Sequence, residues 1–165
     1  MRVDQTEFDG FGIGGALDKS NLGNIVRWVN EELPREKPRH LLGIGEPTDL
    51  FVGVENGADT FDCVAPSREA RTSAVYTDRG RFNVSNGSYR KDFTPIDSEC
   101  GCYTCAHYSK AYINHLFRGK EMVAATLATI HNEYYIINLV ERMRIAIEAG
   151  NFLEFKKEYL ARYKN

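Results

Sequence analysis

Three cysteines fall within one short stretch, Cys100-Gly-Cys102-Tyr-Thr-Cys105, and a histidine, His131, follows farther along the chain. Thiolate sulfur and imidazole nitrogen are the ligands that zinc prefers, and a structural zinc site takes four of them in a tetrahedron. A C-x-C-x2-C stretch wraps three thiolates around one ion, and a helical segment over residues 103–130 returns the fourth ligand. Cys100, Cys102, Cys105 and His131 therefore predict a structural zinc site.

The alternative interpretation of these cysteines is a disulfide or a set of buried thiols. Cys100 and Cys102 are too close in sequence to bridge each other without strain, and nothing in the chain indicates an oxidising compartment. His107 is a competing ligand, but it lies so near Cys105 that tetrahedral closure is awkward, which favours His131. The remaining cysteine, Cys63, is expected to be a reduced, half-buried thiol.

A carboxylate, Asp62, stands in the apolar stretch Thr60-Phe-Asp-Cys-Val64, at the end of an expected strand. A carboxylate in such a place can act as a nucleophile toward an electrophilic sugar carbon, as in retaining glycosyl transfer. The alternative is a helix cap or an ion-pair partner, and these residues by themselves favour that alternative.

Two arginines, Arg68 and Arg71, follow directly in Ser67-Arg-Glu-Ala-Arg71. Guanidinium groups bind phosphates and guanine edges through paired N–H donors. An ordinary solvated face with ion pairs explains the same two residues equally well.

The first 64 residues alternate between short apolar runs and helical spacing. Strands are expected over residues 8–15, 40–45 and 59–64, and helices over residues 22–33 and 47–57. Gly57 suits the C′ position at the end of the second helix. This order predicts parallel strands joined by right-handed crossovers in an α/β fold.

Parallel sheets bind ligands at the carboxyl ends of their strands. Those ends are expected at Gly14-Gly15, at Leu42-Gly43 and at Asp62. Three strands therefore bring two glycine turns and one carboxylate to a single rim. From the Gly14-Gly15 stretch alone, an ordinary tight turn between strand and helix is the favoured interpretation.

The pattern changes after Pro66. Strands flank Asp78-Arg79-Gly80, which is a hairpin signal. Helical spacing then predicts separate helices over residues 108–116 and 122–130, a long helix that begins near His131, and a last helix opened by an Asn151/Glu154 capping box.

The chain has 165 residues, 42% of them hydrophobic and 27% charged, which fits one globular domain with a sizeable core. A net charge of −2 gives no global basic field, so any RNA contact needs a local patch. The sequence has no run of eighteen apolar residues and no signal-peptide pattern, so a cytoplasmic protein is expected.

Taken together, these motifs resemble the C-terminal half of the tRNA-guanine transglycosylases. The stretches that carry the resemblance are Phe8-Asp-Gly-Phe-Gly-Ile-Gly-Gly15, Leu41-Leu-Gly-Ile-Gly-Glu-Pro47, Gly57-Ala-Asp-Thr-Phe-Asp-Cys63, Pro66-Ser-Arg-Glu-Ala-Arg71, the cysteine knuckle and Thr129-Ile-His-Asn132. The resemblance implies the C-terminal part of a TIM (β/α)8 barrel with an inserted zinc-binding subdomain. It implies a partial barrel over residues 1–66, a zinc-binding subdomain over residues 67–131, and C-terminal helices over residues 132–165 that pack on the barrel.

Bacterial members of this family exchange guanine at the tRNA wobble position for a 7-deazaguanine, a step of queuosine biosynthesis. The resemblance implies that Asp62 attacks C1′ of the target ribose and holds it covalently. It also implies that Arg68 and Arg71 contact the anticodon loop, where unpaired bases can be splayed out.

The resemblance further implies a base pocket in which Gly15 and Ala16 offer backbone N–H groups and Leu42 and Gly43 form the floor. Ala16 stands where many members have leucine, and Leu42 stands where methionine is common. The first change leaves a backbone contact in place, and the second conserves volume.

The family's barrel begins before residue 1 of this chain, in a half that carries the general acid/base and the side chains that grip the base. We therefore expect a fragment or a short relative that is inactive alone and that self-associates or pairs with a missing half. The alternative function is a zinc-stabilised module that binds tRNA or a partner subunit without catalysis.

Overall fold

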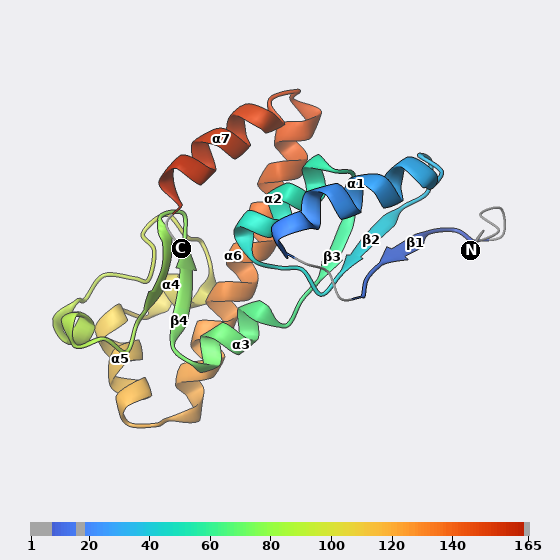
Figure 1. The fold of residues 1–165 in the computed structure, drawn as a ribbon. Helices are drawn as coiled ribbons and strands as arrows, with labels where there is room; N and C mark the ends of the chain where they lie inside the picture. The colour runs from blue at the N-terminus through green and yellow to red at the C-terminus, as the bar shows by residue number, and fades with distance from the viewer. Residues whose placement is uncertain (1–7, 16–18, 164–165) are drawn as a thin grey trace. The chain divides into compact units, whose positions relative to one another are not determined.

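The computed structural model describes residues 8–15 and 19–163 of the chain. It divides into two compact units, Met1–Val64 and Ala65–Asn165. Both combine helices with a small sheet, so the chain is a mixed α/β protein as expected (Figure 1). Within the described residues, no helix is both long enough and apolar enough to span a membrane.

The first unit is built around a three-stranded parallel sheet in the order β1-β2-β3. Its elements are β1 (Phe11–Ile13), η1 (Lys19–Asn21), α1 (Leu22–Glu32), β2 (Arg39–Leu42), α2 (Pro47–Glu55) and β3 (Thr60–Asp62). The parallel arrangement and the order of the elements confirm the prediction from the sequence.

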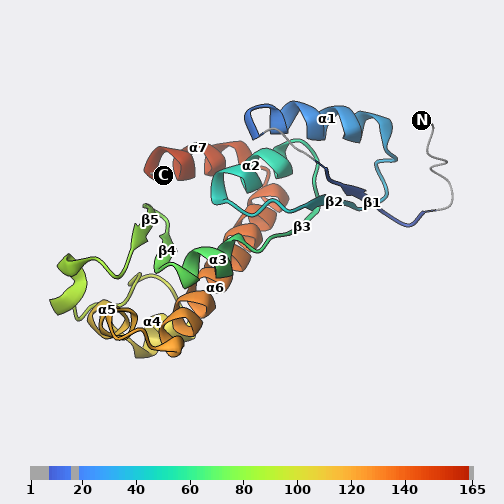
Figure 2. The same ribbon diagram turned by 60° about the horizontal axis from the view of Figure 1, so that its bottom comes forward.

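Helices α1 and α2 lie on the same side of these strands (Figure 2). Leu41, fully buried in the middle of β2, packs into a core with Leu22 and Val26 of α1 and with Ile13 of β1. Because side chains alternate along a strand, His40 and its neighbours two residues away point to the opposite, uncovered face. The helices thus bury one face of the sheet and leave the other for chemistry.

The end of α2 shows why the predicted glycine is needed. Gly57 has φ +96°, a conformation that suits glycine, and the next amide, Ala58 N–H, donates to Gly53 O at 3.0 Å. The chain is thereby turned from α2 into β3, and Asp62 comes to the carboxyl end of the sheet.

The second unit places a hairpin and several helices around one long helix. Its elements are α3 (Ala65–Arg71), β4 (Ala74–Thr77), β5 (Gly80–Asn83), η2 (Gly87–Lys91), α4 (Tyr103–His107), α5 (Lys110–Arg118), α6 (Met122–Glu148) and α7 (Phe152–Arg162). Strands β4 and β5 pair antiparallel, which confirms the predicted hairpin. Helix α3 lies along α6 in both views (Figures 1 and 2).

Two predictions about the helices were wrong. Residues 122–130 and the segment from His131 onward form one continuous helix, α6, because neither glycine nor proline interrupts residues 122–148. Asn151 does occupy the N-cap position of α7, but its side chain makes no capping hydrogen bond, so the predicted capping box is not formed.

A buried asparagine, Asn132, joins α6 to the start of the unit. Its Oδ1 accepts from Tyr76 N–H at 3.1 Å, and its Nδ2 donates to Pro66 O and to Ala74 O, both at 3.0 Å. The side chain is fully buried, and the bonds to Tyr76 N–H and Pro66 O are buried with it, whereas the bond to Ala74 O is partly buried. One amide therefore fixes α3 and β4 against α6.

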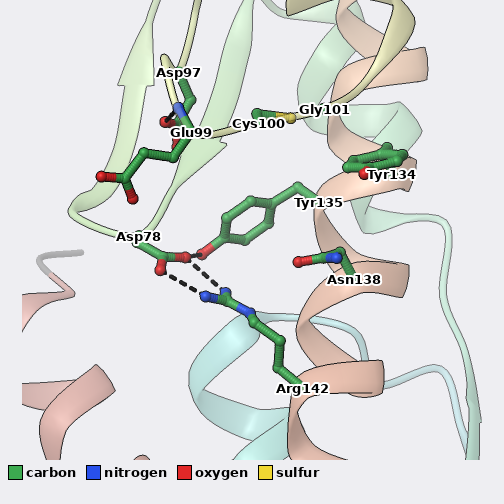
Figure 3. Close-up of a pocket in the computed structure, with 9 residues that line it drawn as sticks. All are labelled: Asp78, Asp97, Glu99, Cys100, Gly101, Tyr134, Tyr135, Asn138 and Arg142. Atoms are coloured by element: carbon green, nitrogen blue, oxygen red, sulfur yellow. Dashed lines mark hydrogen bonds and ion pairs between the residues drawn. The ribbon is translucent and has the colours of Figure 1, made fainter.

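The hairpin turn is held by a second polar network (Figure 3). Arg142 of α6 donates two hydrogen bonds of 2.7 Å to the Asp78 carboxylate, and Tyr135 O–H donates to the same carboxylate at 3.1 Å. Tyr135 in turn bonds Tyr159 of α7. Burial alone would raise the pKa of Asp78, but its hydrogen bonds with Arg142 and Tyr135 hold that pKa below 3.8.

Replacing Asn132 by alanine is expected to lower the free energy of unfolding by about 3 kcal/mol, because three buried or partly buried backbone groups lose their partner. Urea unfolding followed by circular dichroism measures the change as a lower midpoint. Asn138→Ala, on an exposed position of the same helix, is the matched control and is expected to change little. Equal midpoints for the two variants would contradict the role assigned to Asn132.

Asp78→Asn is expected to lower the free energy of unfolding by about 1–2 kcal/mol at neutral pH. The folded-state pKa of Asp78 is depressed, so its contribution is complete above the unfolded value near 3.8 and disappears as pH falls through the lower folded value. Unfolding curves between pH 7 and pH 2 should therefore show the wild-type advantage shrinking only below about pH 4. Glu148→Gln, which breaks an exposed ion pair with Arg144, is the control and should show little effect at any pH.

Candidate metal centre and candidate carboxylate site

The second unit brings together the four predicted metal ligands. The ligand atoms of Cys100, Cys102, Cys105 and His131 all lie within 4.8 Å of one another. His131 Nδ1 is 3.7 Å from Cys100 Sγ, 3.5 Å from Cys102 Sγ and 3.3 Å from Cys105 Sγ. One nitrogen therefore faces three sulfurs, as a four-ligand metal site requires.

Helix ends and helix faces place these ligands. Cys102 is the N-cap residue of α4, and its sulfur accepts from Cys105 N–H at 3.3 Å, which folds the knuckle back on itself. His131 projects from the middle of α6 and is fully buried, and Cys102 is buried beside it. The knuckle and the long helix thus meet at the cluster.

The second ring nitrogen of His131 decides which tautomer is present. Nε2 lies 2.7 Å from Tyr76 O of β4, and a carbonyl oxygen only accepts, so Nε2 carries a proton. In the neutral ring Nδ1 then offers its lone pair toward the three sulfurs. A backbone carbonyl that orients a ligating histidine is the usual outer support of a zinc site.

The electrostatics of the cluster favour a bound cation. Hydrogen bonds from Cys100 and Cys105 lower the pKa of the Cys102 thiol, whereas Cys100 and Cys102 raise the pKa of Cys105. Burial alone would lower the pKa of His131, but its contacts with Cys100 and Cys102 raise it to about 9. Ionised sulfur and imidazole nitrogen are the donors that a bound cation needs, so these interactions are compatible with a metal ion at the centre of the cluster.

The donor set fits zinc. Three sulfurs and one imidazole nitrogen complete a tetrahedral site without an open position, which is the arrangement of structural rather than catalytic zinc. The other candidate ligand, His107, bonds Tyr103 O at 2.9 Å and lies outside the cluster. Cys63 is half-buried, as predicted, and its thiol donates to Gly43 O at 3.5 Å.

The first unit places Asp62 at the carboxyl end of β3, opposite Leu42 of β2. The Asp62 side chain is 59% exposed, and its Oδ1 accepts from Gly43 N–H at 3.2 Å and contacts His40 Nε2 at 3.0 Å. The Gly43 amide and then the His40 ring lower the pKa of this carboxyl group. The result is an accessible carboxylate that stays ionised at neutral pH.

Glycine turns border this carboxylate, as the pattern of strand ends predicted. Gly43 has φ +73° and Gly15 has φ +113°, so both positions favour glycine. A Cβ on Gly14 would lie 2.7 Å from Leu42 Cδ1, so β1 and β2 approach each other too closely for a side chain there. Leu42 is 46% exposed, and Ala16 lies outside the described residues.

Arg68 and Arg71 are exposed on α3, on whose other side Ala70 is buried. Glu69, between them, pairs with Arg81 at 2.9 Å. Within residues 8–15 and 19–163, neither Arg68 nor Arg71 forms an ion pair, so both guanidinium groups are available for a ligand. Glu69 supplies an ion pair on this helix, and the exposure of Arg68 and Arg71 fits both an RNA contact and an ordinary solvated face.

Sequence reasoning attached no role to His40, whose ring contacts the Asp62 carboxylate. The signal lies in the parallel pairing: the register sets His40 opposite Thr60 and Leu42 opposite Asp62. A histidine two residues before the end of one strand therefore shares a face with a carboxylate at the end of the next.

Comparison with known proteins shows the family of this chain. The family model of queuine tRNA-ribosyltransferase matches residues 1–165. A queuine tRNA-ribosyltransferase of Thermoanaerobacter sp. (strain X514) is 48% identical over 166 residues, which are 99% of this chain and 44% of that protein. A protein of the same name from Caldanaerobacter subterraneus subsp. tengcongensis is 47% identical over 98% of this chain and 44% of its own length. Another from Francisella tularensis subsp. novicida is 41% identical over 99% of this chain and 45% of its own length.

The fold and the Cys3His cluster define an α/β protein with a structural zinc site. The family match over the whole chain then makes the assignment specific: the chain belongs to the queuine tRNA-ribosyltransferase family. It spans less than half the length of the curated relatives it matches.

Elemental analysis of the purified chain is expected to find one zinc ion per molecule. Cys102→Ser should lose most of this zinc, because one of the four ligands is removed. It should also melt at a lower temperature, because without the ion the charged groups of the buried cluster are left uncompensated. Cys63→Ser, which changes the cysteine outside the cluster, should keep both the zinc and the melting temperature. A zinc content that does not depend on Cys102 would contradict the site.

Proposed function

We propose that this chain supplies the nucleophile and the structural zinc of a tRNA-guanine transglycosylase. This activity exchanges guanine at the tRNA wobble position for a 7-deazaguanine in queuosine biosynthesis, and we place it in the cytoplasm. Support comes from the family membership, from the Cys3His cluster, and above all from Asp62, an exposed and ionised carboxylate at the carboxyl end of a parallel strand.

In the proposed reaction, Asp62 attacks C1′ of the target ribose while the electron pair of the C1′–N bond leaves with guanine. The deazaguanine then attacks C1′ from the vacated face, and the bond to Asp62 breaks. Two inversions retain the configuration. The transition states carry positive charge on the sugar, which a carboxylate at close range stabilises electrostatically.

The neighbours of Asp62 suit a base and its RNA. We assign the base pocket to the backbone of Gly15 and Ala16 and to Leu42 and Gly43. The left-handed glycines leave this part of the rim without side chains, so a planar base can approach the main chain. We assign Arg68 and Arg71, which are exposed and unpaired among the described residues, to the anticodon loop.

We further propose that the first unit is part of a TIM (β/α)8 barrel. An open doubly wound sheet carries helices on both faces, whereas a barrel carries them only outside. Here α1 and α2 cover the same face of the strands (Figure 2). Phe61 packs against the core on that face, so Asp62, the next residue of β3, lies on the other face. Among the described strands, β1 and β3 each pair on one side only, so further strands or another chain can add at either edge. The division at residues 66 and 131 stays a prediction.

A non-catalytic tRNA-binding or partner-subunit module is the second candidate function. Its support is the zinc cluster, whose four protein ligands leave no open coordination position, as in a structural rather than a catalytic site. The two functions differ in whether Asp62 forms a bond to RNA.

The test is a covalent complex between the chain and tRNA that carries guanosine at the wobble position, detected on a denaturing gel. The chain is assayed alone, and with the part of the Thermoanaerobacter relative that it does not cover. We expect no complex from the chain alone, and a complex with the added part that Asp62→Asn abolishes. Asp9→Asn, an exposed carboxylate before β1, is the control and should leave the complex unchanged. If no complex forms under either condition, the binding module is the better description.

A further inference from the structure

The imidazole of His40 spans two side chains of the neighbouring strand. Its Nδ1 lies 2.8 Å from Thr60 Oγ1, and its Nε2 lies 3.0 Å from Asp62 Oδ1. Both ring nitrogens are therefore engaged, so the plane of the ring and its distance from the carboxylate are fixed at once.

The sheet itself builds this arrangement. Parallel pairing sets His40 opposite Thr60, and Asp62 is two residues farther along β3, on the same face. The residues between them point away: Leu41 is fully buried in the core, and Phe61 packs against that core. Neither strand can turn its polar residues elsewhere without exposing this core.

The partners of the ring determine its protons. An ionised carboxylate only accepts hydrogen bonds, so Nε2 carries a hydrogen and donates it to Asp62. In the neutral ring Nδ1 is then an acceptor, and the Thr60 hydroxyl donates to it. The carboxylate thus selects the tautomer, and the Thr60 hydroxyl, which can donate or accept, complements it.

The two donors fall on the same carboxylate oxygen. Asp62 Oδ1 receives both the His40 ring and the Gly43 amide, which is 3.2 Å away. These bonds orient the carboxyl group and leave Oδ2 as the oxygen that is not held by either of them.

We propose that His40 is a positioning residue for the nucleophile. Its ring fixes Asp62 Oδ1, so that Oδ2 forms the bond to the sugar carbon. This inference rests on the proposed function. In the covalent step the Oδ2 lone pair forms the bond to C1′, guanine leaves with the electrons of its bond, and the His40 hydrogen stays on Nε2.

Stability of the fold does not account for this pair. The His40 and Asp62 side chains are 36% and 59% exposed, and exposed ion pairs contribute little to the free energy of unfolding. Removing the ring is therefore expected to leave the fold intact, which makes its role in orientation separable from a structural one.

Nitrogen-15 NMR of the labelled chain tests the geometry without activity. We expect the neutral ring of His40 to be the Nε2–H tautomer, and we expect Asp62→Asn and Thr60→Val each to change its ring resonances. The exposed His115 is the internal control and should not respond. Ring resonances of His40 that are the same in all three proteins would overturn the proposal.

The rate of covalent complex formation, measured with the added part of the relative, tests the role. His40→Leu should slow the reaction by about 10- to 100-fold with unchanged affinity for tRNA, because the nucleophile is misplaced. His40→Gln, whose side-chain amide can still donate to Oδ1, should retain most of the rate. Equal melting temperatures establish that both variants fold.

The outcomes separate the two proposals. If Asp62→Asn forms no complex while both His40 variants react like the wild type, the role of His40 is wrong and the proposed function stands. If Asp62→Asn still forms the complex, both are wrong. Equal slowing by leucine and glutamine would also overturn the positioning role, because it would show that the donor is irrelevant.

Discussion

The second unit depends on the two-sided engagement of one buried imidazole. An imidazole has only two ring nitrogens, and in His131 one bonds the backbone of β4 while the other faces three sulfurs of the knuckle. The hairpin, the knuckle and α6 therefore meet at a single side chain. The next residue, Asn132, bonds the same strand from the same helix, so the zinc ligand and the asparagine clamp form one continuous attachment.

The two sites differ in exposure, as the different roles proposed for them require. The metal cluster closes around a buried histidine, so an ion there meets protein ligands alone and holds segments together. The Asp62 carboxylate accepts from the Gly43 amide and contacts the His40 ring, and most of its side chain meets solvent. Rigid placement with an open approach is what a nucleophile toward a large substrate needs.

Residue types and short spacing predicted much of this structure. The cysteine knuckle with His131, the hairpin around Asp78 and the glycine after α2 each follow from local chemistry, and the structure places them as expected. The assumed break in α6 was wrong because a ligand position does not end a helix; only backbone breakers or caps do. The His40–Asp62 contact was missed because strand register, which joins them, is set by packing far away in sequence.

The lowered pKa of Asp62 has opposite effects on the two halves of the proposed exchange. Hydrogen bonds from Gly43 and His40 stabilise the carboxylate and so weaken it as an attacking group. In the second half Asp62 is the leaving group, and the same bonds favour its departure. A double displacement proceeds well only when neither half is much slower than the other. Two donors on Oδ1 suit both halves of the proposed exchange, because they stabilise the charge of the departing carboxylate and leave the bond to carbon to Oδ2.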